Sequence, residues 1–358
     1  MHGCSEADEG PLPFLHVMGP ADHRSTLQYG LAQGHHCGVI GSTDHHSAYP
    51  GSYGHGRTGL WATTKTRAAI WEALWARRTY ALTGDRIELR FAINGEPMGT
   101  VLPATDRRQI DVQVTGGAPI DYVDVIKNNA LWRRVSRCDV ARQGGHSQET
   151  SSSGRLLSPC SAHAPDRARP GADDDLIHTK IFLEVGWGER NVRAEWDVRL
   201  GISAGQVLAV EPRFRGPEVV APTEIDDAFD DVPPSHWQRD GERGVRFSTT
   251  TFGNPNNRTP ATQGVCLEVA LPREAKVWAA INGQQVTYPL ETLLEGARAG
   301  RLGKIASPAY RFHRAPRPWE YDWRFTLEDR GESGDFYYVR VRQLNDQWAW
   351  SSPIWLGS

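Results

Sequence analysis

The prediction of the fold starts from residues 37–62, CGVIGSTDHHSAYPGSYGHGRTGLWA. Residues 37–43 form a short apolar run between polar segments, which is typical of a buried strand. Residues 47–60 contain four glycines and a proline, so we expect a loop there. The predicted strand therefore ends next to Asp44, and the loop carries the chain on to Trp61.

A helix is predicted on each side of this stretch. Residues 25–33 have Ser25 in position to cap a helix N-terminus and Gly34 directly after the expected end. In residues 63–78 the apolar side chains fall on one stripe at helical spacing. The resulting order of helix, strand, loop and helix is an α/β pattern.

Beyond Gly84 the pattern changes to strands. Apolar residues alternate or run continuously over strand lengths, and turn residues such as Asn94-Gly95 separate them. The predicted strands are 87–93, 110–115, 122–126, 177–185, 192–200, 245–251, 265–270, 277–281 and 336–344, with one short helix in 290–299. The later three-quarters of the chain is thus predicted to be mainly β and to form a sandwich.

Composition excludes several classes of function. The 358 residues carry 40 Lys and Arg against 43 Asp and Glu, and a formal charge of −3 argues against a broad nucleic-acid surface. No apolar run approaches the roughly 20 residues of a membrane helix, so we expect neither a nucleic acid nor a membrane as partner. The N-terminus lacks the regions of a signal peptide, and the 5 cysteines form no CxxC pair. These features favour a cytoplasmic protein.

Histidines crowd the beginning of the chain. Of the 13 histidines, 8 lie within the first 55 residues, which is typical of a metal or acid–base site. Asp44 and His46 directly follow the predicted strand, and residues two apart in an extended chain point to the same side. A carboxylate and an imidazole are suitable ligands of Zn, Mn or Fe. The alternative is that Asp44 caps the following turn and His46 is solvated.

The loop after this pair is rich in glycine. Residues 51–56, Gly-Ser-Tyr-Gly-His-Gly, lack the lysine and the hydroxyl of a phosphate-binding P-loop. We interpret them as a loop that flanks an active site, in which His55 and Arg57 contact an anionic substrate.

Four tryptophans near the end of the chain have two interpretations. The simpler one is packing in the sandwich core or between domains, and the other is an aromatic platform for carbohydrate. The residues concerned are Trp323, Trp348, Trp350 and Trp355.

A known family shares several of these stretches. Residues 37–62, followed by TRAAIWEALWARRTYALTGDRIELRF at 66–91, resemble the last βα units of the PHP (polymerase and histidinol phosphatase) metallohydrolases. The greatest likeness is to a branch of that family with a long β-rich C-terminal extension. The opening His2-Gly-Cys-Ser-Glu6 resembles the H-G-x-S-E segment of that branch, and residues 338–342 and 349–355 resemble its closing strands.

The resemblance implies a specific chemistry. In this family a distorted (βα)7 barrel holds up to three divalent metal ions, which activate a water for hydrolysis, typically of phosphate esters. By position, His2 corresponds to a histidine ligand from the middle of the barrel, and Asp44 and His46 to the final D-x-H pair. The implied cofactor is a divalent metal (Zn, Mn or Fe), and the implied substrate is a small molecule of the phosphoester class. Such a metal lowers the pKa of its bound water toward neutrality.

The chain departs from the family pattern at its start. Family members place an H-x-H strand, a further His or Asp and a bridging Glu before the segment that matches His2, and the printed sequence lacks them. We therefore expect an N-terminally truncated member with an α+β fold. Its predicted domains are C-terminal βα units of the barrel in 1–85, a β-rich domain in 86–210 with a mobile loop at 147–175, and a β-rich extension in 211–358.

Two classes of function stay open. The first is a PHP-like metal-dependent hydrolase with a phosphoester substrate. The second is a non-catalytic β-sandwich protein with a binding or structural role, because the ligands from the first half of the barrel are missing. The sequence makes no prediction of the oligomeric state.

Overall fold

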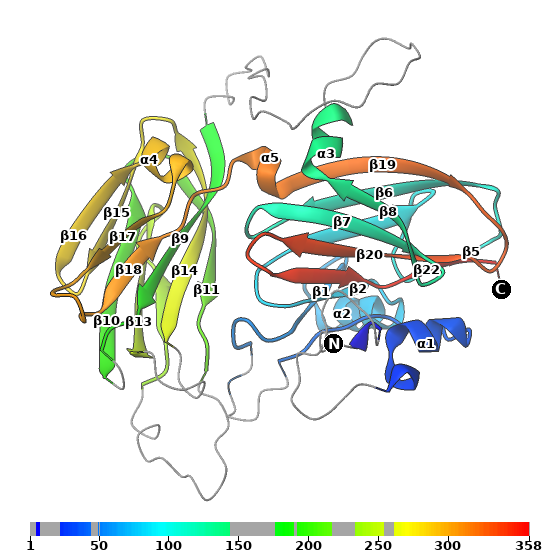
Figure 1. Cartoon of the computed structure of the whole chain (residues 1–358), viewed down its shortest axis with the longest axis horizontal. Coiled ribbons are helices and arrows are strands. Elements are labelled where there is room, and N and C mark those ends of the chain that lie inside the picture. The colour runs from blue at the N-terminus through cyan, green and yellow to red at the C-terminus, as the bar shows by residue number, and fades with distance from the viewer. Residues whose placement is uncertain are drawn as a thin grey trace, which may run out of the picture.

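The protein consists of two β-sandwiches that lie side by side, as Figure 1 shows. The computed structural model describes residues 5–7, 22–43, 49, 51–143, 176–189, 192–216, 233–253 and 261–357. All strand pairs within these ranges are antiparallel except the pair of β22 with β5. No described helix is long and apolar enough to cross a membrane.

The first sandwich packs an eight-stranded sheet on a four-stranded sheet. The larger sheet contains β1 (Arg57–Leu60), β2 (Thr79–Leu82), β5 (Val101–Leu102), β7 (Ile120–Lys127), β8 (Ala130–Ser136), β20 (Phe336–Gln343), β21 (Trp348–Ser351) and β22 (Ile354–Leu356). The smaller sheet contains β3 (Glu88–Ile93), β4 (Glu96–Pro97), β6 (Arg107–Thr115) and β19 (Asp322–Arg330). Because β20 pairs with β7, and β19 with β6, the end of the chain returns to strands formed near its beginning.

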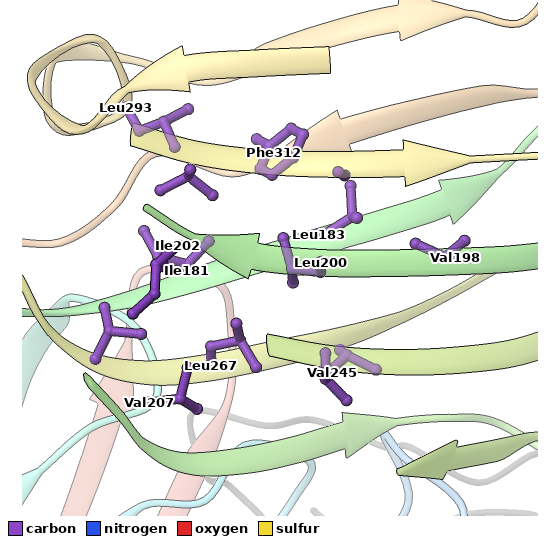
Figure 2. Packing of buried hydrophobic residues seen from close by; sticks show 14 of the residues in the cluster. Ile181, Leu183, Val198, Leu200, Ile202, Val207, Val245, Leu267, Leu293 and Phe312 are labelled. Carbon is purple, nitrogen blue, oxygen red and sulfur yellow. The ribbon is translucent and has the colours of Figure 1, made fainter. Parts of the chain in front are cut away.

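The second sandwich packs two five-stranded sheets face to face. One contains β9 (Leu176–Gly186), β11 (Gln206–Arg213), β14 (Thr262–Pro272), β17 (Arg298–Arg301) and β18 (Ala309–Phe312). The other contains β10 (Arg193–Ile202), β12 (His236–Arg239), β13 (Gly244–Phe252), β15 (Lys276–Ile281) and β16 (Gln284–Pro289). Figure 2 shows Leu183, Leu200 and Phe312, all fully buried, in the core between the sheets. Each of these side chains occupies an alternate position of its strand, which is the pattern that predicted the sandwich.

The helices are short and lie outside the sheets. They are α1 (Leu27–Ala32), α2 (Arg67–Trp75), α3 (Arg137–Gln143), α4 (Leu290–Glu295) and α5 (Pro318–Tyr321), with a 3-10 turn at His23–Ser25. The helices predicted in 25–33 and 63–78 are confirmed as α1 and α2. The cap of α1 is Thr26 instead of Ser25, because the Thr26 hydroxyl accepts a hydrogen bond from the Tyr29 N–H at 3.2 Å.

The prediction of barrel-type βα units is wrong. Strands β1 and β2, which flank α2, pair antiparallel, with Thr58 opposite Ala81. A βα barrel requires parallel strands joined by crossover helices, whereas α2 is an insertion between the two arms of an antiparallel pair. The α+β class is therefore replaced by a mainly antiparallel β fold.

Residues 37–43, predicted as a buried strand, belong to no sheet in the part of the chain that the structure describes. They run extended, and the Val39 N–H donates to the Ser352 hydroxyl at 2.8 Å. Val39 is only 3% exposed because it covers the eight-stranded sheet from outside. An apolar run that covers a sheet has the same local pattern as a strand within one.

The strands predicted beyond Gly84 are confirmed, although several are longer than expected. The sequence predicted 122–126, for example, and the strand spans Ile120–Lys127. The four tryptophans at 323, 348, 350 and 355 are all buried, so their interpretation as packing residues is confirmed. The predicted mobile loop at 147–175 lies outside the described residues.

Candidate functional site

The predicted metal ligands His2, Asp44 and His46 lie outside the described residues. Among the residues that the structure describes, no group of three or more His, Cys, Asp or Glu side chains is arranged to hold a metal ion. The candidate site is therefore defined by the residues beside these ligands and by the glycine-rich loop. Both parts contact the eight-stranded sheet.

Glu6, four residues after His2, is anchored on the outer face of that sheet. Its side chain is buried, and its carboxylate accepts hydrogen bonds from Tyr338 Oη at 2.7 Å, Arg340 Nη1 at 2.9 Å and Trp350 Nε1 at 2.9 Å. Burial of a charge is tolerated only where partners of this kind replace water. Glu6 thus ties the segment that follows His2 to strands β20 and β21.

The network around Glu6 extends to a second carboxylate. Arg340 also donates from Nη2 to Asp124 Oδ2 at 2.7 Å, so one guanidinium joins the N-terminal segment to β7. Burial alone lowers the pKa of Arg340, but the Glu6 and Asp124 carboxylates outweigh this effect and raise it. Burial also raises the pKa of Tyr338, and the nearby Glu6 charge raises it further, so Tyr338 stays a hydrogen-bond donor.

The segment before Asp44 reaches the same face. Val39 belongs to a cluster of buried side chains that includes Tyr338 and Trp350, two of the residues that bind Glu6. The segment that follows His2 and the segment that precedes Asp44 therefore pack on the same face of the eight-stranded sheet.

The last described residues before Asp44 also touch the glycine-rich loop. The Gly41 carbonyl accepts a hydrogen bond from the Thr58 hydroxyl at 2.5 Å, and the Gly41 N–H donates to that hydroxyl at 3.2 Å. A Cβ on Gly56 would lie 2.1 Å from the Ser42 carbonyl oxygen, so only glycine permits this approach. The contact places Ser42 directly beside the chain between His55 and Arg57.

The glycine-rich loop also docks on the second sandwich. Ser52 is fully buried, and its hydroxyl accepts a hydrogen bond from the Gly216 N–H at 3.0 Å. The Tyr53 N–H donates to the Phe214 carbonyl at 2.8 Å. Residues 51–56 therefore form part of the junction between the sandwiches.

Arg57, a predicted substrate contact, pairs with a carboxylate of the second sandwich. Its Nη1 lies 3.2 Å from Glu211 Oε1, and that oxygen also accepts from the Arg86 N–H at 2.7 Å. An anionic substrate would have to compete with Glu211 for this guanidinium. His55, the other predicted contact, is half-buried two residues earlier.

A second buried ion pair completes the junction. Asp85 and Arg213 lie 3.1 Å apart, and Asp85 also accepts hydrogen bonds from Tyr53 at 2.8 Å, Gln343 at 2.7 Å and Asn345 at 2.8 Å. Burial by itself raises the pKa of Asp85, but Arg213 and the three hydrogen bonds outweigh it and hold the pKa below its usual value. Asp85 is therefore a charged structural carboxylate and not a proton donor.

The junction also encloses a thiol. Cys266 lines a small pocket together with Arg86, Lys180, Glu211 and Glu268. Burial raises the pKa of Cys266 to about 11, so the thiol stays protonated near neutral pH. A protonated, buried thiol is a poor nucleophile, and the pocket supports no cysteine chemistry.

Sequence reasoning identified part of this arrangement. It named His55 and Arg57, and it quoted Glu6 within the His2 motif without giving it a role. It missed Asp85 and Arg213, because no local spacing connects residues that meet only where two sandwiches join.

Comparisons with known proteins cover only part of the chain. A family model described as "Protein of unknown function (DUF3604)" matches residues 51–96, which include the glycine-rich loop and Asp85. An uncharacterized protein of Chlamydia muridarum is 29% identical over 143 residues, which are 35% of this chain and 23% of the relative. One of Chlamydia pneumoniae is 34% identical over 124 residues, which are 31% of this chain and 20% of the relative. The chain thus spans about a fifth to a quarter of the length of these relatives, and no solved structure matches it.

Proposed function

We propose that this chain is a metal-dependent hydrolase of phosphoesters. In this proposal His2, Asp44 and His46 are ligands of a divalent metal ion. The resemblance to the PHP metallohydrolases supplies the chemistry. The observation that carries the proposal is that the segments next to these ligands are anchored on one face of the eight-stranded sheet.

The anchors limit where the ligands can lie. A fully extended chain spans at most about 3.6 Å per residue, so His2 lies within about 14 Å of Glu6. Asp44 directly follows Thr43, whose neighbour Ser42 contacts Gly56. Glu6 bonds to Tyr338 and Trp350, and Val39 packs in the cluster that contains them, which supports the proposal that the two ligand-bearing segments meet.

Rigid support of this kind is what a metal site requires. Ligands bind a metal tightly when neighbouring groups hold them in place before the metal arrives. The bound metal would supply a water of lowered pKa. Within this proposal, His55 contacts the substrate, while Arg57 holds the loop through its pair with Glu211.

The test is metal content measured by mass spectrometry on the purified chain. We expect at least one equivalent of Zn, Mn or Fe, and its loss in the double variant Asp44→Ala/His46→Ala. The matched control is His45→Ala, which removes the imidazole between the two proposed ligands. We expect it to leave the metal in place, because alternate residues of an extended chain face opposite sides. Hydrolysis of a generic phosphoester with added Mn or Zn is then measured on the same proteins.

Equal and sub-stoichiometric metal in the wild type and the double variant would refute the metal site. Stoichiometric metal without hydrolysis of any phosphoester would refute the substrate class alone. The two parts of the proposal therefore fail separately.

A second candidate function is a non-catalytic β-sandwich protein with a binding or structural role. The junction favours it, because Arg57 and Arg213 are both matched by the carboxylates of Glu211 and Asp85. Charges matched in this way fit a structural contact between the sandwiches. This candidate predicts neither bound metal nor turnover.

A further inference from the structure

The second sandwich carries a groove on one of its two sheets. It lies on the outer face of the sheet formed by β9, β17 and β18, at the left of Figure 1. Its lining includes Ala299 and Ala309 and, as the larger side chains that we call its walls, Trp187, Arg301 and Arg311. Its volume of about 330 Å³ is in the range that accommodates a small ligand.

The two arginines of the groove lie on the same face of adjacent strands. The register places Ala299 opposite Arg311 and Arg301 opposite Ala309, so the two arginines are diagonal neighbours. Side chains in that relation lie roughly 7–8 Å apart at their bases, and long side chains can reach a common ligand. Arg301 is held in place by a hydrogen bond from Nη1 to the Ile305 carbonyl.

Among the described residues, neither arginine forms an ion pair. In the ranges that the structure describes, no carboxylate lies within 4.0 Å of the Arg301 or Arg311 guanidinium. Glu184, directly across from Arg311 on β9, forms its ion pair with His313 at 2.8 Å, and the Arg311 charge helps to lower its pKa from beyond ion-pair distance. Two neighbouring positive charges repel each other, so an anion between them would be stabilised by both.

The third wall is a tryptophan in an unusual conformation. Trp187 has a φ of 57° and stands between Gly186 and Gly188, which also have positive φ. The left-handed region is unfavourable for a bulky side chain and persists where the surrounding structure imposes it. Here the Trp187 N–H donates to the Ala261 carbonyl at 3.0 Å. The indole is thereby presented at the groove, with the Arg311 guanidinium 5.2 Å from its ring centroid.

We propose that this groove binds a small anionic ligand that carries a sugar ring. Arg301 and Arg311 hold its oxyanion, a carboxylate or a phosphate, and the ring lies against Trp187. A guanidinium pair suits either oxyanion, because each presents oxygens that can accept two parallel hydrogen bonds. The aromatic wall supplies a flat apolar surface for the ring. The site shares no residue with the proposed metal site, so each can fail without the other.

The test is ligand titration of the full chain by NMR or calorimetry. The probes are glucuronate, glucose 6-phosphate and neutral glucose. We expect at least one anionic probe to bind, and glucose to bind at least about tenfold more weakly, since charged hydrogen bonds are typically worth a factor of that size or more. The stronger of the two anionic probes identifies the preferred oxyanion.

Three variants locate the binding. Arg301→Gln/Arg311→Gln should weaken the anionic probe at least about tenfold, and Trp187→Gly should weaken it without unfolding the chain, because glycine suits the positive φ. Arg324→Gln, an exposed arginine of β19 in the first sandwich, is the matched control and should leave binding unchanged. Circular dichroism confirms that each variant is folded.

Two results would overturn the proposal. One is equal binding of glucose and the anionic probes, or no binding of any of them. The other is unchanged affinity in a folded Arg301→Gln/Arg311→Gln variant.

Discussion

The two sandwiches differ in what covers their outer faces. In the first, described residues before Thr43 cover the larger sheet, and central strand β20 is buried on both sides at every position but Arg342. In the second, central strand β10 alternates over Glu195–Arg199 between exposed outward positions and buried inward positions. The covered face neutralises its charges in networks, as Glu6 does with Arg340, whereas the open face leaves Arg301 and Arg311 for a ligand.

The difference also concerns the path of the chain. The second sandwich uses the continuous stretch from β9 to β18, whereas the first combines β1–β8 with β19–β22 from the end of the chain. The junction charges, Asp85 and Arg213, come one from each sandwich. Variants that break the junction and variants that detach the residues before Thr43 from the first sandwich should therefore change the free energy of unfolding in distinguishable ways.

The largest effect is expected from Arg213→Ala. This variant leaves the Asp85 carboxylate buried without its cationic partner, and breaking a buried pair from one side typically lowers the free energy of unfolding by about 3–5 kcal/mol. Urea unfolding measures the change, and separate transitions would show that the sandwiches have become uncoupled. Arg246→Ala, which removes an exposed pair with Asp197, should change the free energy of unfolding far less, because solvent screens that pair. Equal losses in the two variants would contradict the role of the junction.

A smaller and more local effect is expected from Glu6→Ala. Three buried donors lose their acceptor, although Arg340 keeps Asp124, so we expect a loss of about 2–3 kcal/mol. Hydrogen exchange should rise in β20 and β21 and stay unchanged in β9 and β14. Glu6→Gln retains one acceptor oxygen and should lose less. Faster hydrogen exchange in both sandwiches would contradict this local effect. It would show that the segment anchored by Glu6 also stabilises the second sandwich.

Acid should weaken the first sandwich through Asp335. Burial by itself raises the pKa of this carboxyl, but hydrogen bonds from Arg108 and Asn128 outweigh it and lower the pKa to about 2. Because the folded pKa lies below the usual value of about 3.9, the stabilisation is complete well above pH 4 and is lost as the pH falls toward 2. The loss is about 2 kcal/mol, and Asp335→Asn should lack this part of the pH dependence. The measurement is urea unfolding at pH 5 and pH 2. The control variant Asp106→Asn, at an exposed position, should keep the pH dependence of the wild type.

The smallest effect is expected from Trp187→Gly in the open groove. Loss of the indole and relief of the left-handed conformation oppose each other, so the free energy of unfolding should change by less than about 1 kcal/mol. The contrast is Trp196→Ala in the core of the same sandwich, whose indole is 2% exposed and should cost about 3–5 kcal/mol. Comparable losses at both positions, measured by thermal unfolding, would make Trp187 a packing residue.

Much of the secondary structure could be predicted, and most of the pairing could not. Alternation placed β13 and β15 within a few residues, because a strand with one buried face must repeat every second residue. The run 37–43 was interpreted as a strand, since its local pattern is the same whether it pairs in a sheet or covers one. The family resemblance then suggested parallel βα units, and the antiparallel pairing of β1 with β2 overturned that architecture.

The candidate site divides in the same way. Histidine crowding and the D-x-H spacing drew attention to the beginning of the chain, and the glycine-rich loop pointed to Arg57. No pattern in the sequence indicated that Arg57 would meet Glu211, because the partner lies on β11 of the other sandwich. The groove of Trp187 was missed for the same reason, since Trp187 follows β9 and is distant in sequence from the pair of β17 and β18 that carries Arg301 and Arg311.

Local sequence patterns placed most strands and helices to within a few residues, because alternation, helix caps and turn residues act over a few neighbouring positions. Tertiary contacts placed the last strands in the first sandwich and buried Glu6 against β20 and β21. They also left Arg301 and Arg311 without an ion-pair partner among the described residues. These outcomes depend on contacts between distant segments. Many pairings satisfy the same local pattern, and the free energy of the whole assembly selects among them.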